Sequence, residues 1–383
     1  MMDGVVMLVN EFTPVSGGAE KQAERLAGYF AGLGRCVWVI TRHFPGLAST
    51  EMMNGFRVIR PATRGPGKLK TVTFVLGALW HLYLLRRQYA IIHAHMLFGP
   101  AFAAVLAGRL LGKRVIVKLG SSGPDGEIQM SLRTIRGRLR LALLRRWADV
   151  IIALDDDMQA EALSAGFSRE CVYRNVNGID VPSFAPAMPR EDAKAILGKK
   201  DNTLVLFVGR LVPQKSIPSL LKALQKAVQT CPDLHLMLVG SGPEHDFLQA
   251  LVDELEIREF VTFAGNQSDV KPYLNASDIF VLTSESEGMS NALMEGMAAG
   301  LPCLATPVGA SPNMLDHGRY GMLIPVGDVT AWADALVELA RSPARRMELG
   351  RAAQARIKSE YDFSVIGARY EALYQELMKL GVK

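Results

Sequence analysis

Residues 283–302 read TSESEGMSNALMEGMAAGLP and carry the densest structural information in the chain. The apolar run Ile279–Leu282 before them is typical of a buried strand, and a loop containing Gly and Ser follows it. We expect a helix to begin near Asn291 and to end at Gly300 and Pro302, which stop helices. A strand, a loop and a helix in this order form the repeating unit of a parallel sheet covered by helices.

The same alternation of apolar, β-rich runs and helix-length amphipathic stretches extends through the rest of the chain. In the first half we predict strands over residues 5–9, 36–41, 56–60, 90–93, 114–119, 150–153 and 172–175. In the second half we predict strands over residues 204–208, 234–239, 261–263, 279–282, 303–305 and 322–324. Helices fit between them, for instance over residues 19–33 and 100–111. The pattern predicts an α/β fold with doubly wound parallel sheets.

The chain divides into two similar halves. Residues 181–189 contain three prolines, which interrupt both helix and sheet, and we interpret them as a linker. We predict a Rossmann-like domain over residues 1–182 and a second one over residues 183–362. Such halves would face each other across a deep cleft bordered by the carboxyl ends of both sheets, where these folds bind ligands.

Composition excludes several classes of protein. A charged fraction of 21% and a hydrophobic fraction of 49% argue against disorder, and no uncharged apolar run of the required length could span a bilayer. The four cysteines lack a CxxC spacing, so neither a disulfide framework nor a thiolate metal site is indicated. The first residues enter a strand-like run without a signal-peptide pattern, and we therefore expect a cytoplasmic protein.

Charge is distributed unevenly along the chain. The first 180 residues carry 23 Lys and Arg against 14 Asp and Glu, whereas the remainder carries 20 against 24. Residues 133–147 mix six arginines with apolar residues, so they either lie on an anionic membrane or form a core helix with a charged outer face. Residues 71–85 are apolar but too short to span a membrane. Sparse aromatic residues and the acidic second half argue against nucleic-acid binding.

Two glutamates are the first candidate site residues. Glu287 falls in the loop of the opening stretch, and Glu295 follows in the helix, facing the same crevice. Amides at a helix start hold an anion, and ionised carboxylates accept hydrogen bonds from hydroxyls. One loop is therefore suited to a phosphate and a polyol together. The spacing alone equally allows two solvated acids, one of them placed at the favourable end of a helix.

Two further candidate sites lie in the first half of the chain. Gly17 and Gly18 follow the first predicted strand, and paired glycines permit close approach of the backbone to a ligand. His93 and His95 end another strand, where period-two alternation puts both rings on one face. No third metal ligand is suggested near the two histidines, so a metal site is not expected there.

The stretch at 283–302 resembles the E-x7-E signature of retaining family-4 glycosyltransferases of GT-B fold, the glycosyl transferases group 1. Three shorter segments support the resemblance. GRLVPQK at 209–215 is similar to the family's G-R-L-x-x-x-K, NGID at 177–180 to its N-G-V-D, and GSGPE at 240–244 to its G-x-G-P-E. Together these pieces are spread over nearly the whole chain.

The resemblance implies a role for each matching residue. Glu295 would bind the ribose hydroxyls of a nucleotide sugar, and Glu287 and His95 would contact the transferred sugar, which leaves His93 to packing. Arg210 and Lys215 would hold the donor diphosphate; hydrogen bonds to charged groups contribute about 1.5–3 kcal/mol each, against about 0.3–1 kcal/mol for a helix dipole. The implied catalytic residues are Glu287, His95, Arg210 and Lys215. The implied donor-binding residues are Gly17, Gly18, Arg210, Lys215, Glu287, Gly288, Met289, Ser290, Asn291 and Glu295. The implied acceptor-side residues are Gly18, Gly120 and Ser121.

The expected function follows from the same resemblance. A sugar would pass with retention from a nucleoside-diphosphate sugar, a UDP-sugar in preference to a GDP-sugar, to an acceptor hydroxyl. The acceptor would be a glycan, a lipid-linked molecule or a small molecule, in the synthesis of a cell-surface glycan, glycolipid or related glycoconjugate. We expect no metal and no cofactor, a cytoplasmic enzyme at the inner face of the membrane, and a final helix over about 363–383 that packs back on the first domain.

Two positions depart from the family pattern, and two motifs are ambiguous. Leu119-Gly120 stands where many relatives have His-Gly, and Asn313 stands where a glutamate is frequent. The triple aspartate at 155–157 imitates a D-x-D metal site but is better placed to cap a helix. Gly240-Ser241-Gly242 suggests a dinucleotide fingerprint that lacks its third glycine.

Alternatives of two kinds remain at this point. An epimerase acting on a nucleotide sugar, or a sugar phosphorylase, would keep the fold and change the chemistry. A non-catalytic scaffold that binds a sugar nucleotide would keep the site and lose the turnover.

Overall fold

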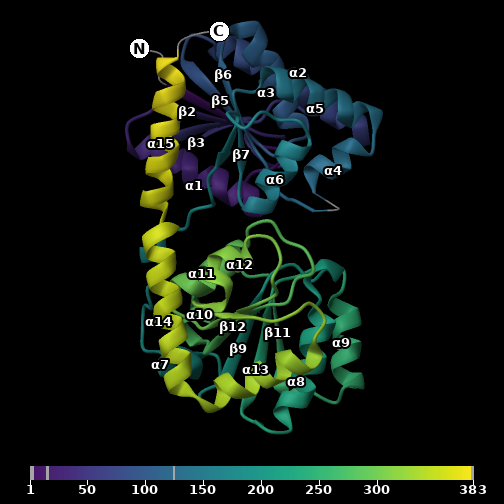
Figure 1. Cartoon of the computed structure of the whole chain (residues 1–383), viewed down its shortest axis with the longest axis vertical. Coiled ribbons are helices and arrows are strands. Elements are labelled where there is room, and N and C mark those ends of the chain that lie inside the picture. Colours follow the sequence, from purple (N-terminus) through teal and green to yellow (C-terminus); the bar gives the residue numbers. More distant parts are fainter. Residues whose placement is uncertain (1–3, 14–16, 124–125, 381–383) are drawn as a thin grey trace. The chain divides into compact units, whose positions relative to one another are not determined.

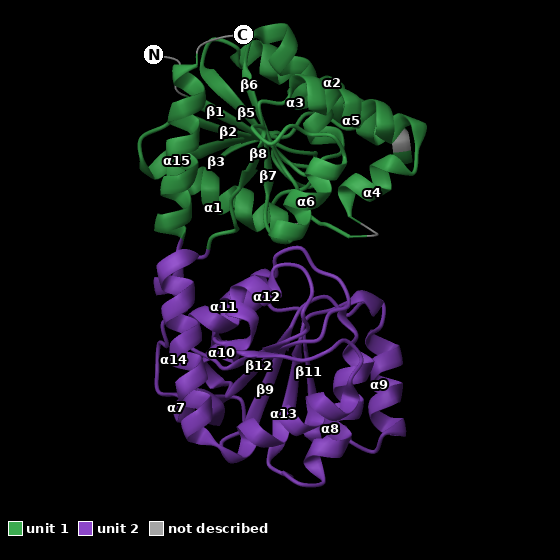
Figure 2. Cartoon of the chain, in the orientation of Figure 1, with its two compact units in different colours: residues 1–178, 363–383 green, residues 179–362 purple. Residues whose placement is uncertain are grey.

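The computed structural model describes residues 4–13, 17–123 and 126–380. They belong to two compact units, unit 1 (residues 1–178 and 363–383) and unit 2 (residues 179–362) (Figure 2). Each unit contains a sheet flanked by helices (Figure 1). The predicted α/β fold with two Rossmann-like sheets is confirmed. Residues 181–189, the predicted linker, fall near the start of unit 2 and begin with a 3-10 helix over Val181–Phe184.

The sheet of unit 1 has the strand order β3-β4-β2-β1-β5-β6-β7-β8. All of its neighbours pair in parallel except β3 and β4, which form an antiparallel hairpin. The strands are β1 Gly4–Leu8, β2 Val37–Ile40, β3 Thr50–Met53, β4 Phe56–Ile59, β5 Tyr89–His95, β6 Arg114–Lys118, β7 Val150–Ala153 and β8 Val172–Arg174. The sequence prediction placed all of these strands but β3 to within two residues at each end.

Helices cover both faces of this sheet. They are α1 Gly18–Gly32, α2 Gly67–Leu85, α3 Gly99–Leu111, α4 Glu127–Leu132, α5 Ile135–Trp147, α6 Asp156–Ser164 and α15 Phe363–Lys379. Helices α1 and α15 contact each other and the sheet (Figure 1). Helix α3 contacts β1, β5 and β6, and it also contacts α2 and α5. Strands β1, β5 and β6 are buried almost throughout, as parallel strands between two helical layers must be.

Unit 2 contains a six-stranded parallel sheet in the order β11-β10-β9-β12-β13-β14. Its strands are β9 Thr203–Val208, β10 Leu234–Val239, β11 Val261–Gly265, β12 Ile279–Leu282, β13 Cys303–Ala305 and β14 Met322–Leu323. Its helices are η1 Val181–Phe184, α7 Arg190–Ile196, η2 Pro213–Lys215, α8 Ile217–Val228, α9 His245–Glu254, η3 Arg258–Phe260, α10 Lys271–Ala276, α11 Asn291–Ala298, α12 Ser311–Met314, η4 Asp316–Gly318, α13 Val329–Arg341 and α14 Pro343–Glu360.

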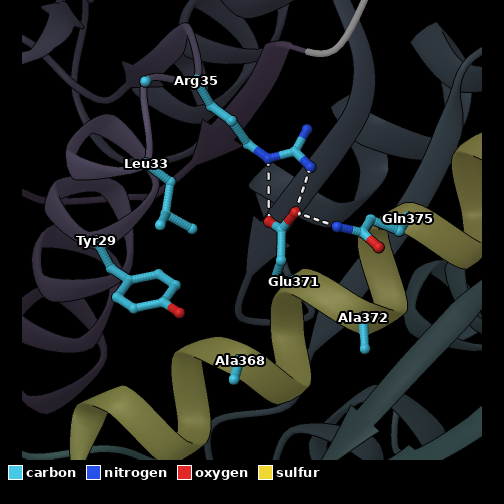
Figure 3. Close-up of a pocket in the computed structure, with 8 residues that line it drawn as sticks. Tyr29, Leu33, Arg35, Ala368, Glu371, Ala372 and Gln375 are labelled. Carbon is cyan, nitrogen blue, oxygen red and sulfur yellow. Dashed lines mark hydrogen bonds and ion pairs between the residues drawn. The ribbon is translucent and has the colours of Figure 1, made fainter.

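The last helix returns to unit 1, as the resemblance implied. Ile366, Tyr370 and Tyr374 on α15 are buried in the same apolar cluster as Phe30 on α1. At the edge of this cluster the Arg35 guanidinium donates two hydrogen bonds to the Glu371 carboxylate, at 3.0 and 2.5 Å (Figure 3). A helix from the far end of the sequence is therefore part of the core of unit 1.

We predict that Ile366→Ala destabilises unit 1 selectively. Removing a fully buried isoleucine side chain costs about 2–5 kcal/mol, and Ile366 is 0% exposed. Hydrogen exchange followed by mass spectrometry should show faster exchange in β1 and β5, with β9 and β10 unaffected. The exposed neighbour Arg369 supplies the control, since Arg369→Ala should change stability by no more than about 0.5 kcal/mol. Unchanged exchange in β1 for Ile366→Ala would show that α15 is not part of this core.

Candidate active site

The strand order of unit 2 determines where a ligand site can form. From β9 the chain winds outward to β10 and β11, and it then returns to place β12 on the other side of β9. In open parallel sheets the crevice at such a reversal, outside the carboxyl ends of the strands, is the usual binding place. The loops that leave β9 and β12 border this point. They contain the predicted residues Arg210, Lys215 and Glu287.

Hydrogen bonds hold these two loops together. The Glu285 amide donates to the Gln214 carbonyl at 2.9 Å, and the Gln214 side chain donates to the Ser286 carbonyl at 2.7 Å. The Thr283 hydroxyl donates to the Lys215 carbonyl at 2.7 Å. The loop after β9 is therefore fixed to the loop after β12 on both sides of Lys215.

Lys215 and Glu287 form an ion pair between the two loops. Their side chains are only 14% and 13% exposed, and the Ser284 hydroxyl donates a further hydrogen bond of 2.8 Å to the same carboxylate oxygen. The lysine stem passes Gly209, where a β-carbon would lie 3.7 Å from Lys215 Cε. One predicted cation and one predicted acid thus meet at the strand-order reversal, although 72 positions separate them in the chain.

Arg210 occupies the same loop and is exposed. The loop around it packs backbone to backbone on the loop after β10: the Leu211 amide donates to the Ser241 carbonyl at 2.9 Å. A β-carbon on Gly240 would lie 1.8 Å from the Gly209 carbonyl oxygen, and one on Gly242 would lie 2.2 Å from the Leu211 carbonyl oxygen. These glycines serve the close packing of two loops, which accounts for the G-x-G spacing without a nicotinamide cofactor.

The remaining predicted donor residues surround the start of α11. Ser290 caps the helix, because its hydroxyl accepts a 3.3 Å hydrogen bond from the Leu293 amide. The Gly288 carbonyl accepts one of 2.8 Å from the Ala310 amide, Met289 is buried, and Asn291 is the first residue of the helix. Glu295 is 5% exposed. Its predicted contact with ribose stays a prediction.

A glycine from the neighbouring strand's loop supports the Glu287 turn. Gly309 has φ +54°, and a β-carbon there would lie 2.3 Å from the Gly288 carbonyl oxygen and 2.5 Å from that of Glu287. Since both contacts are with backbone, a side chain cannot be accommodated without moving the turn. This role of Gly309 was not predicted from the sequence.

In unit 1 the strand order reverses between β1 and β5. The loop after β1 reaches Gly17, whose amide donates to the Glu20 carboxylate at 3.0 Å, and Gly18 begins α1. His95 ends β5 and is 1% exposed. The predicted sites at Gly17, Gly18 and His95 therefore come from the two elements that border the reversal.

The two histidines share one face, as predicted, with ring centroids 4.4 Å apart. His93 lies 2.6 Å from the Tyr374 hydroxyl, in keeping with its predicted packing role. Burial, with His93 and Lys118 nearby, lowers the pKa of His95 well below its usual range, so the ring is neutral. Neither ring nitrogen of His95 has a hydrogen-bond partner among the described residues. A neutral imidazole in this state is able to donate a hydrogen bond to a sugar hydroxyl or to accept one from it.

A buried lysine lies beside His95 and was not predicted from the sequence. Lys118 is paired in register with His95 across β5 and β6, and its ammonium donates a 2.6 Å hydrogen bond to the Asn177 side chain. Burial lowers the pKa of Lys118 to about 7. A lysine at the carboxyl end of a strand whose three central residues are apolar was the signal available in the sequence. Asn177, part of the N-G-I-D segment, thus contacts the carboxyl edge of the sheet.

Glu127 was also missed, and it holds the predicted acceptor-side loop. Its carboxylate accepts hydrogen bonds from the Gly120 amide at 2.7 Å and from the Leu97 amide at 3.0 Å, so it joins the loops after β5 and β6. Burial raises the pKa of Glu127 to about 7. Gly120 and its half-buried neighbour Ser121 keep their acceptor-side role as a prediction.

The triple aspartate caps a helix, as the sequence favoured. The Asp155 carboxylate accepts a 2.6 Å hydrogen bond from the Met158 amide at the start of α6. Asp156 forms an ion pair of 3.2 Å with Arg174. Within the part of the chain that the structure describes, no group of three His, Cys, Asp or Glu side chains is arranged to hold a metal.

Comparison with known proteins gives the family. Residues 202–342 match the model of "Glycosyl transferases group 1", and residues 17–178 match that of the "Glycosyl transferase 4-like domain". The chain is 27% identical to N-acetyl-alpha-D-glucosaminyl L-malate synthase of Bacillus anthracis over 77% of this chain and 76% of that protein. It is 25% identical to a GDP-mannose-dependent alpha-(1-6)-phosphatidylinositol monomannoside mannosyltransferase of Mycolicibacterium smegmatis, over 96% and 97%.

Solved structures agree on the fold. Anabaena Alr3699/HepE in complex with UDP-glucose superposes with a TM-score of 0.81 at 20% identity, covering 97% of this chain and 99% of that one. Sucrose-phosphate synthase from Thermosynechococcus elongatus gives 0.81 at 23% identity, over 99% and 100%. The protein is a glycosyltransferase of GT-B fold. It belongs to family 4, the glycosyl transferases group 1, as its E-x7-E stretch indicated.

We predict that Gly309→Ala lowers the rate of sugar transfer at least tenfold, because the added carbon displaces the turn that carries Glu287. Gly327→Ala is the matched control: Gly327 also has a positive φ, of 75°, but no atom lies within 4 Å of its β-carbon position. Both variants bear the backbone strain, and only the first disturbs the loop. Equal rates for the two variants would exclude a functional role for this contact.

We also predict a pH-dependent contribution from Glu127. Its pKa rises from an ordinary 4.5 to about 7 on folding, so between these values the folded chain binds more protons than the unfolded chain. The free energy of unfolding of the native protein therefore falls, relative to that of Glu127→Gln, by about 3 kcal/mol as pH rises through this range. The difference becomes constant about one pH unit above the folded-state pKa.

Urea unfolding of both proteins at pH 5, 6, 7 and 8 measures this difference. Other titrating groups are common to the two proteins and cancel. A difference that does not change with pH would mean that Glu127 ionises normally in the folded state.

Proposed function

We propose that this glycosyltransferase uses a nucleoside-diphosphate sugar and transfers the sugar with retention of anomeric configuration. The Lys215–Glu287 ion pair at the strand-order reversal carries the proposal. A family resemblance assigns the lysine to the diphosphate and the glutamate to the sugar. The solved relatives with UDP and with UDP-glucose support a donor of this class.

The ion pair suggests how donor binding and chemistry are coupled. A diphosphate bears more negative charge than one carboxylate and offers more acceptor oxygens, so it competes for the Lys215 ammonium. Exposed Arg210 from the same loop supplies a second cation. Glu287, still held by the Ser284 hydroxyl, would then accept hydrogen bonds from the sugar. The cations also stabilise the charge that develops on the leaving diphosphate, where transition-state stabilisation is most effective.

Retention is proposed to follow a same-face route. The leaving diphosphate, stabilised by Lys215 and Arg210, accepts the proton of the incoming hydroxyl while the new bond forms on the face that it vacates. This route requires no covalent nucleophile from the protein. Neutral His95 in unit 1 is proposed to contact the donor sugar.

For the acceptor we propose a glycan or a lipid-linked molecule, in the assembly of a cell-surface glycoconjugate at the inner face of the cytoplasmic membrane. The basic character of the first 180 residues suits an anionic acceptor. Several relatives are named for lipid acceptors, among them a phosphatidylinositol mannosyltransferase and a galactosyltransferase acting on GlcNAc-diphosphoundecaprenol. We propose UDP before GDP as the donor nucleotide, although relatives of both kinds are known.

We predict that Lys215→Ala lowers sugar transfer at least a hundredfold while the fold is retained, and that Arg210→Ala has a smaller effect in the same direction. Lys222→Ala, an exposed lysine on α8, should transfer sugar at the native rate. Transfer is measured by release of nucleoside diphosphate from UDP- and GDP-sugars with a lipid-linked acceptor, and circular dichroism monitors folding.

Nuclear magnetic resonance of the product tests the reaction class. An α-linked product from an α-linked donor supports the proposal. A β-linked product contradicts retention, an epimerised nucleotide sugar would indicate an epimerase, and a sugar phosphate would indicate a phosphorylase.

A further inference from the structure

Helix α2 exposes a continuous apolar face. Along its 19 residues, six large apolar side chains are each between 47% and 61% exposed: Leu69, Val72, Leu76, Trp80, Tyr83 and Leu84. Exposed apolar residues are ordinary when they are scattered singly. A row of six on one helix is not, and neither the sugar-transfer site nor the core of unit 1 uses it.

The geometry of the helix puts all six side chains on one side. At 100° per residue they fall within an arc of about 120°, and they extend for about 22 Å along the helix axis. Phe74, Ala78 and Leu82, which point the opposite way, are 0% exposed. That opposite side packs on α3. The helix is therefore apolar on both sides, with one side in the core and the other facing outward.

Cationic side chains lie near both ends of this face. The Arg86 guanidinium lies 4.0 Å from the centre of the Tyr83 ring, and exposed Arg87 continues the line of the apolar row beyond the helix end. Near the other end, the Lys70 ammonium lies 5.4 Å from the Phe44 ring. Aromatic rings beside long cationic side chains are typical of a protein surface at the headgroup level of a bilayer.

Helix α5 adds to the basic surface. Helix α3 contacts both α2 and α5, so the three helices form one layer of unit 1 (Figure 2). Residues 128–148 contain six arginines and no acid, and Ile135 and Leu139 on α5 are 85% and 63% exposed. Of the two helices, α2 has the larger exposed apolar area and α5 the higher positive charge.

We propose that the α2 face docks on an anionic lipid bilayer, with α2 lying in the plane of the interface and its six apolar side chains inserted among the acyl chains. Interfacial helices bind in this way, by buried apolar area plus attraction to anionic headgroups. Helix α2 would lie on the membrane and not cross it, since no described helix meets the length and hydropathy needed to span a bilayer.

Charge favours a bilayer over a second copy of the chain. A symmetric dimer through α2 would bring the cations at the ends of this helix together, and α2 contains no carboxylate to neutralise them. An anionic membrane satisfies the apolar row and the cations at once. This inference deepens the acceptor side of the proposed function, but its test measures lipid binding without sugar transfer, so either proposal can fail alone.

Vesicle flotation of the full chain tests the docking. We expect binding to vesicles of phosphatidylcholine with 30% phosphatidylglycerol, and at least tenfold weaker binding to phosphatidylcholine alone. The double variant L76S/W80S should bind the anionic vesicles at least tenfold more weakly than the native chain. The control M52S removes an apolar side chain that is 63% exposed on β3, and it should bind like the native chain.

Thermal midpoints of the variants keep the result interpretable, because serine at exposed positions should leave folding intact. Native-like binding by folded L76S/W80S would overturn the proposal, as would absence of binding by the native chain. A native dimer in size-exclusion chromatography that L76S/W80S converts to a monomer would assign the face to a second copy and would also overturn it.

Fluorescence quenching by brominated lipids locates the inserted helix. Trp80 is 60% exposed, Trp147 is on α5, and Trp38 and Trp332 are buried. We expect W80F to lose most of the quenching seen in the native chain and W147F to keep it. The reverse result would place the inserted segment on α5 and contradict the assignment to α2.

Discussion

The contact between the Lys215 ammonium and the Glu287 carboxylate depends on one property of the sheet, the adjacency of β9 and β12. Adjacent parallel strands bring the loops at their carboxyl ends together, whatever their separation in the sequence. Hydrogen bonds from Gln214, Thr283 and Ser284 then fix the loops so that the two charges meet. Both side chains are mostly buried, so an unpaired charge at either one is costly. A ligand that binds one of them must therefore leave the other with a partner of its own.

Three glycines of unit 2 have a common role in this arrangement. Gly240 and Gly242 let the loop after β10 pack on the Arg210 loop, and Gly309 lets the loop after β13 pack on the Glu287 turn. At each of these positions a β-carbon would collide with backbone. The charged side chains are therefore carried by loops in mutual backbone contact, which limits their motion and preorganises the site for a diphosphate.

In unit 1 the candidate site residues also lie at a reversal of strand order, but their side chains differ from those of unit 2. Its reversal lies between β1 and β5, where the structure places a glycine turn and neutral, buried His95. Lys118 and Glu127 are buried beside the same edge, and burial shifts the pKa of each toward 7 from opposite directions. One unit thus presents a paired charge, and the other presents groups that are able to be neutral near physiological pH.

Much of the fold could be predicted from the sequence because buried parallel strands read as continuous apolar runs. Strand β3 was missed since Thr50–Met53 is short, half exposed and poor in β-branched residues; the Asn54-Gly55 pair after it, both with positive φ, was the usable hairpin signal. Two separate motifs pointed to Lys215 and to Glu287, and the structure brings these two side chains into contact. Lys118 and Glu127 were missed because their importance arises from burial, which no local pattern encodes.

The proposed role of Lys215 can be measured directly by titration calorimetry with UDP and GDP. Loss of a hydrogen bond to a charged group, about 1.5–3 kcal/mol, should weaken diphosphate binding by Lys215→Ala about 10- to 150-fold, with no change in Lys222→Ala. If folded Lys215→Ala bound the diphosphate as tightly as the native chain, the ion pair with Glu287 would be structural only, and the account of donor binding would be wrong.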